Sequence, residues 1–171
     1  YNAFRWRLPE RYNIAHDVCD RHAGDPGKVA LIHETGSGSV DRYSFRQIRD
    51  FANRLANALT HLGLSRGDRV LIYLGQHPAT AIAHVACWKA GMVSVPTSTL
   101  FGVDALEYRL QTSGARVLLT DLANLAVVAA ARPKAPTLQQ VFLVDGAAPD
   151  TLPFWDTIAR ASDQFATLSL H

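Results

Sequence analysis

The chain has 171 residues, of which 48% are hydrophobic and 19% are charged. A chain of this length and apolar content can bury a core without disulfide staples, and it is not intrinsically disordered as a whole. Lysine and arginine number 17 against 15 acidic residues, and this net charge of +2 is too weak and too scattered to indicate a nucleic-acid partner. The two cysteines, Cys19 and Cys87, support neither a disulfide framework nor a zinc site.

We expect no targeting signal at the ends of this sequence. No run of about 18 apolar residues is present, so we expect no membrane span. The aromatic and basic start lacks the pattern of a secretion signal, and free cysteines favour the cytoplasm. The first residue is not methionine, and residues 166–171 show no closing helix pattern. We therefore expect a trimmed or incomplete chain that ends in the middle of its architecture.

We predict an N-terminal arm over residues 1–27 and an α/β subdomain over residues 28–171. Within the arm, His16 and Asp20 have the i, i+4 spacing of a helical pair. That spacing favours a local hydrogen bond between the two side chains over a metal site.

The subdomain begins with two short β-prone runs, at 29–33 and 40–43, which flank the Gly/Ser-rich residues 35–39. This pattern predicts a β-hairpin. A phosphate-binding loop is disfavoured, because no lysine follows the glycines and no helix starts directly after them.

A long amphipathic helix follows the hairpin. Ser44 and Gln47 have the Ser-x-x-Gln spacing of a capping box, and Gly63 is typical of the residue after a helix end. One face of this helix is predicted to be apolar: Ile48, Phe51, Ala52, Leu55, Leu59 and Leu62.

Strands and helices then alternate to the end of the chain. The predicted strands cover residues 69–74, 92–96, 116–120 and 140–144. The predicted helices cover residues 78–90, 103–113, 122–131 and 153–161. Alternation at this spacing predicts an α/β fold with a mostly parallel sheet flanked by helices.

Ligands of such sheets bind beyond the carboxyl ends of the strands. The hydroxyl-rich run 97–99 either lines a ligand crevice there or satisfies backbone groups in a turn. The positions of Asp121 and His77 at strand ends favour helix capping over catalysis. For His84 and Cys87, we expect core packing rather than a nucleophile pair.

Known phosphate-binding motifs are missing from these strand ends. Neither a dinucleotide fingerprint nor a P-loop occurs, which argues against a dinucleotide oxidoreductase. Thr112-Ser113-Gly114 is interpreted as a helix end, because an anion site needs the loop to precede a helix.

An ordered series of segments resembles the N-terminal part of the AMP-forming acyl-CoA synthetases, in the adenylate-forming superfamily. The likeness runs from about Arg5 to Phe165, and the opening residues 11–20 resemble the acetyl- and medium-chain-type members. The segments are YSFRQ (43–47), RLANAL (54–59), LGLSRGDRV (62–70), ACWKAGMVSVP (86–96) and YRLQTSGAR (108–116).

The resemblance implies an enzyme that couples a carboxylic acid to ATP and passes the acyl group from AMP to coenzyme A. ATP, Mg²⁺ and coenzyme A are then the cofactors of the full-length protein, and none is expected to bind tightly here. The phosphate loop and the catalytic lysine of the family are expected after residue 171, so no catalytic residue is assigned.

The same resemblance places an edge of coenzyme A near two loops of this chain. Its candidate residues are Thr99, Leu100, Phe101, Gly102, Asp121 and Asn124.

Two functions therefore compete. The chain is either an N-terminal fragment that is inactive alone, with the missing remainder of its own chain as partner, or a non-catalytic binding or interaction module. A fragment should expose an apolar face of several hundred Å², whereas an autonomous module should have a closed polar surface. The sequence identifies neither the acid nor the oligomeric state, and a homo-oligomer stays open.

Overall fold

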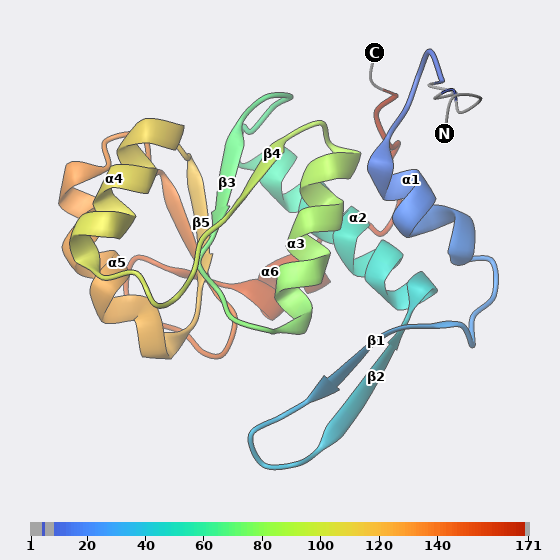
Figure 1. The fold of residues 1–171 in the computed structure, drawn as a ribbon, viewed down its shortest axis with the longest axis horizontal. Coiled ribbons are helices and arrows are strands. Elements are labelled where there is room, and N and C mark those ends of the chain that lie inside the picture. Colours follow the sequence, from blue (N-terminus) through green and yellow to red (C-terminus); the bar gives the residue numbers. More distant parts are fainter. Residues whose placement is uncertain (1–4, 6–8, 170–171) are drawn as a thin grey trace.

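Five parallel strands form the central sheet of the computed structural model, which describes residue 5 and residues 9–169 (Figure 1). The spatial order is β4-β3-β5-β6-β7. The strands are β3 (Arg69–Ile72), β4 (Val93–Pro96), β5 (Val117–Thr120), β6 (Gln140–Leu143) and β7 (Leu152–Pro153). The predicted parallel sheet is confirmed, and the two-residue β7 adds an edge strand that the sequence did not indicate.

Helices cover both faces of this sheet (Figure 1). Alternate strand residues point to opposite faces, so Ile72 packs in one apolar cluster and Leu71 in the other. The first cluster contains α2 (Phe45–His61), α3 (Pro78–Lys89) and α6 (Phe154–Ala159), and the second contains α4 (Val103–Ser113) and α5 (Leu125–Ala131). Burial on both faces explains why the strands are continuous apolar runs.

The predicted hairpin and long helix are confirmed. β1 (Val29–Glu34) and β2 (Val40–Ser44) pair antiparallel in a separate small sheet. Ser44 and Gln47 form the reciprocal bonds of a capping box, and Gly63 takes a φ of +83° after the helix end. Leu62, expected on the same apolar face, is the C-cap residue of α2 and is 37% exposed, so this end of the face is only partly covered.

Short elements fill the remaining connections. A 3₁₀ turn, η2 (Leu122–Asn124), precedes α5, so only its later part is the α-helix predicted from residue 122. A second, η3 (Arg132–Lys134), contains Pro133 and closes α5. Within the described part of the chain, no helix has the length and apolarity that a bilayer crossing requires.

The region predicted as an arm packs against the helices, although residues 1–4 and 6–8 lie outside the described part. α1 (Ile14–Val18) and η1 (Asp20–His22) contact α3 and α2. The prediction of a His16–Asp20 hydrogen bond was wrong, because α1 ends before Asp20. The Asp20 carboxylate instead accepts from the ammonium of Lys89. The boundary at residue 27 stays a prediction.

Candidate functional site

The candidate residues lie at the carboxyl edge of the sheet, where the loops after β4 and β5 emerge. The chain runs from β3 outward to β4 and then returns to β5 on the other side of β3. The strand order therefore reverses at β3, and a reversal of this kind is where open α/β sheets place their ligands.

Tyr73, just after β3, anchors the first candidate loop. Its hydroxyl donates to the carbonyl oxygen of Phe101 at 2.5 Å, with the Thr99 carbonyl 3.4 Å away. Burial, and then the negative charge of Asp121, raise the pKa of Tyr73 above its ordinary value. The hydroxyl therefore keeps its proton and fixes the loop 99–102 to the sheet.

The loop 99–102 leaves an apolar tip in solvent. The side chain of Leu100 is 92% exposed, the largest exposure among the large hydrophobic side chains of the described residues. Beside it, the guanidinium of Arg109 stacks over the Phe101 ring, 3.7 Å from its centroid. Gly102 then begins α4 without a side-chain cap.

The second loop is held by its own hydrogen bonds. One carboxylate oxygen of Asp121 accepts from the backbone N–H of Asn124 at 2.9 Å and from its side-chain amide at 2.7 Å. The predicted capping role of Asp121 is confirmed. Leu122 donates its N–H to Asp145 at 2.8 Å, which links this loop to the one after β6.

A cavity of about 460 Å³ opens beside the first loop, between β3, β4 and α3. It is lined by Thr97, Ser98 and Thr99, but the other five candidate residues do not contribute to it. The Ser98 hydroxyl also accepts from the Leu100 N–H at 3.2 Å, so this run both lines a crevice and satisfies backbone groups. Among the described residues, no carboxylate, lysine or arginine lines the cavity, and burial lowers the pKa of its one histidine, His84, so it suits a neutral group better than a phosphate.

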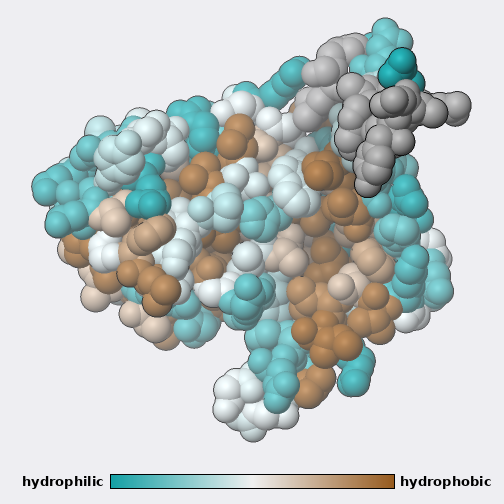
Figure 2. Space-filling view, viewed as in Figure 1, coloured by the Kyte–Doolittle hydropathy of each residue, from teal (hydrophilic) through white to brown (hydrophobic). Residues whose placement is uncertain are grey.

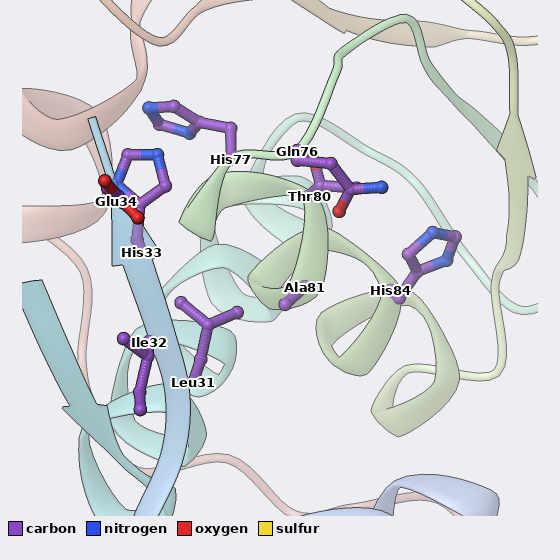
Figure 3. A pocket seen from close by; sticks show the side chains of 9 residues that line it. All are labelled: Leu31, Ile32, His33, Glu34, Gln76, His77, Thr80, Ala81 and His84. Atoms are coloured by element: carbon purple, nitrogen blue, oxygen red, sulfur yellow. The ribbon is translucent and has the colours of Figure 1, made fainter. Parts of the chain in front are cut away.

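A second groove of about 360 Å³ lies between β1 and the first half of α3. Figure 3 shows His33, Glu34 and His77 close together at one end and His84 at the other. The rings of His33 and His77 are 5.6 Å apart. Burial, followed by the nearby His33, lowers the pKa of His77, which favours the neutral ring at neutral pH.

The other potentially reactive side chains are engaged in hydrogen bonds or buried. His77 caps α3, because its ring accepts from the Ala79 N–H. His84 faces the Ser94 hydroxyl at 3.0 Å, while burial raises the pKa of the Cys87 thiol to about 12. Cys87 is therefore a core residue as predicted, not an activated nucleophile. Within residues 9–169, no cluster of histidine, cysteine or carboxylate side chains could hold a metal ion.

Sequence reasoning missed the two residues that organise this edge. Tyr73 is a polar-tipped residue in an aliphatic strand run, and a buried tyrosine hydroxyl needs a partner, so a signal was present. Arg109 gave none, because its contact with Phe101 depends on how the loop turns into α4.

Comparison with known proteins identifies the family of this fold. A family model described as "AMP-binding enzyme" matches residues 19–167. An acetyl-coenzyme A synthetase of Streptomyces coelicolor is 38% identical over 118 residues, which cover 68% of this chain and 18% of that protein. The human mitochondrial acyl-coenzyme A synthetase ACSM5 is 33% identical over 168 residues, which cover 94% and 29%.

The structure agrees with these sequence matches. The crystal structure of the anthranilate CoA ligase AuaEII with anthranoyl-AMP superposes with a TM-score of 0.88 at 25% identity. The match covers 96% of this chain and 31% of that one. The chain thus spans less than a third of the length of each of these relatives, and it belongs to the AMP-binding enzyme family.

Proposed function

We propose that this chain is the N-terminal part of an ATP-dependent, AMP-forming carboxylic acid–CoA ligase and is inactive by itself. One observation carries the proposal: the alignment with human ACSM5 uses 94% of this chain but only 29% of that protein. In the complete enzyme, an acyl-adenylate would form first and acyl-CoA second. The proposed location is the cytoplasm, in keeping with two free, buried cysteines.

The described residues at the carboxyl edge of the sheet do not fit ATP and Mg²⁺. Acyl-adenylate formation needs cations or N–H donors at the reacting phosphate. Here the cavity after β4 is lined without charged side chains, and the carboxylate of Asp121 is engaged in capping. We therefore assign the phosphate-binding groups to polypeptide outside this chain, and derive no chemical step from these residues.

An exposed apolar surface supports a fragment over an autonomous module. Figure 2 shows hydrophobic side chains gathered over α3 and the hairpin. On the hairpin, Ile32 is 61% exposed beside the groove that α3 borders. At the other end of α3, Ile14 and Val93 are 41% and 47% exposed and line a further groove of about 420 Å³. A closed polar surface, expected of the alternative module, is not what these side chains form.

The proposal predicts that the isolated chain does not catalyse either half-reaction. It should release no pyrophosphate when incubated with ATP, Mg²⁺, coenzyme A and short- or medium-chain carboxylic acids, because it lacks donors for the phosphates. A pyrophosphate assay checks this, with a complete acetyl-CoA synthetase as the positive control. Pyrophosphate release above the enzyme-free rate would contradict the proposal.

We also propose that Thr99, Leu100, Phe101, Gly102, Asp121 and Asn124 form an edge of the coenzyme A site. The support is their shared place at the carboxyl edge, the anchoring of the first loop by Tyr73 and the exposed Leu100. An apolar loop tip suits the pantetheine arm, whereas neither loop carries a lysine or arginine for the phosphates. Binding to this chain is therefore expected to be weak.

A titration with coenzyme A, followed by NMR, tests this edge. Amide shifts should be confined to the two loops and should fail to saturate at millimolar ligand. Leu100→Ser should reduce the shifts severalfold. Leu168→Ser, which changes an exposed leucine elsewhere, should leave them unchanged. Shifts that are unaffected by Leu100→Ser would place the ligand somewhere else.

A further inference from the structure

Residues 161–168, near the end of the described chain, run beside the helices toward α1 and are called the C-terminal strap (Figure 1). It has no regular secondary structure, and its side chains alternate between half-buried and exposed. Phe165 is one of the half-buried residues and packs against the main apolar cluster. A segment with this alternation is docked on the surface of the molecule along its whole length.

Three side chains of α2 hold the strap by its backbone. Asn57 donates to the carbonyl oxygens of Ser162 at 2.7 Å and Gln164 at 2.9 Å. Asn53 donates to the carbonyl of Asp163 at 2.7 Å, and Arg54 donates to that of Ala161 at 2.7 Å. These bonds recognise the path of the strap rather than its side chains.

The far end of the strap is bonded to the α1–η1 segment. The amide of Asn13, the N-cap residue of α1, donates to the carbonyl oxygens of Leu168 and Trp88, both at 2.7 Å. The Thr167 hydroxyl donates to the Asp20 carboxylate at 3.2 Å, and this carboxylate also bonds the buried ammonium of Lys89.

A backbone hydrogen bond also joins the strap to the end of α3. The N–H of Leu168 donates to the carbonyl of Lys89 at 2.8 Å. Lys89 therefore binds the strap through its backbone carbonyl and the Asp20 carboxylate of α1–η1 through its side chain. Release of the strap would leave Asn13 with one acceptor fewer and the Asp20 carboxylate without its hydrogen bond from Thr167. Opening of the strap therefore weakens the docking of α1–η1.

We propose that the C-terminal strap is a latch for the N-terminal segment, so that residues 14–23 and 161–168 dock and undock as one cooperative unit. α2 supplies the fixed side of the latch, and Asn13 and Asp20 supply the moving side. Because coupling between two elements is reciprocal, loosening either segment must loosen the other.

Hydrogen–deuterium exchange of the 171-residue chain tests this latch. Asn57→Ala removes two bonds to the strap and none of the hydrogen bonds to α1–η1. It should raise exchange about tenfold in residues 161–168 and also in residues 14–23, since each lost bond contributes modestly to docking. Faster exchange in the strap alone would overturn the proposal.

A reciprocal variant tests the other direction. Arg46→Ala removes the bonds of α2 to the carbonyl oxygens of Ala23 and Gly24 and none to the strap, so the strap should exchange faster only through the loosening of α1–η1. An unchanged strap would contradict the coupling. If Asn57→Ala does not fold, Thr167→Val replaces it, with the same two segments expected to respond to a smaller degree.

Gln111→Ala is the matched control. Its side chain also donates to a backbone carbonyl, that of Lys134 at 3.0 Å, but it does so on the opposite face of the sheet. Exchange should rise near Lys134 and stay unchanged in residues 14–23. A general rise in this control would show that any lost bond loosens α1–η1, and would overturn the latch.

Discussion

Lys89→Met is expected to lower the free energy of unfolding by about 3–5 kcal/mol, the usual cost of removing one partner of a buried ion pair. The Lys89 side chain is 2% exposed and bonds the Asp20 carboxylate, whose side chain is 16% exposed. Without the ammonium, that carboxylate keeps, among the described residues, a single hydrogen bond from Thr167. Urea denaturation followed by circular dichroism measures the loss.

Lys134→Met provides the comparison. Lys134 also bonds a carboxylate, that of Glu107 at 2.9 Å, but its side chain is 64% exposed. Lys134→Met should cost less than Lys89→Met, because water already solvates the Lys134 ammonium even though the Glu107 side chain is only 12% exposed. Equal losses for the two lysine variants would show that burial of Lys89 is not what matters. A double variant, Asp20→Leu with Lys89→Met, should recover part of the lost stability, because it leaves no unpaired charge.

Features that depend on a few neighbouring residues could be predicted from the sequence. The capping box of Ser44 and Gln47 is complete within four residues, and Gly114 takes the left-handed conformation that ends α4. The strand–helix alternation was equally local, and with the rule of right-handed crossovers it sufficed for the fold class. Because the strands of the sheet are buried on both faces, they could be recognised as uninterrupted apolar runs.

Contacts between distant segments could not be predicted in this way. The partner of Asp20 is 69 residues away, so helical spacing alone pointed to His16 instead. Lys89 lies in the last turn of α3, where a basic residue ordinarily faces solvent and the negative helix end. The position of the strap could not be predicted from a periodic sequence pattern. Asn53 and Asn57 bind the carbonyl oxygens of its backbone, and such bonds do not depend on which side chains the strap carries.

The candidate site was predictable in position and not in detail. Topology alone indicates the carboxyl edge, where both loops emerge, and Tyr73 anchors the loop of Phe101 there. The path of the loop after β4 decides which atoms are left for a ligand. Tyr73 takes the Phe101 carbonyl, and Asp121 is used for capping, so the exposed Leu100 remains.

Phe142→Ala is expected to lower the free energy of unfolding by about 3–5 kcal/mol, because removal of the large side chain would leave a cavity against the sheet. Phe142 is fully buried on β6, and its ring meets that of Phe154 edge to face with centroids 6.2 Å apart. The sheet side of this cavity is backbone paired to β5 and β7, which cannot collapse inward. Differential scanning calorimetry and urea denaturation both measure the change.

Two further variants separate burial from ring contact in this layer. Phe142→Leu keeps most of the volume and loses the aromatic contact, so it should cost about 1 kcal/mol. Phe101→Ala removes the same number of atoms from a half-buried ring covered by Arg109, and should cost clearly less than Phe142→Ala. Equal losses at Phe101 and Phe142 would mean that the β5–β6 layer relaxes around the lost ring, and that the sheet is softer than its burial indicates.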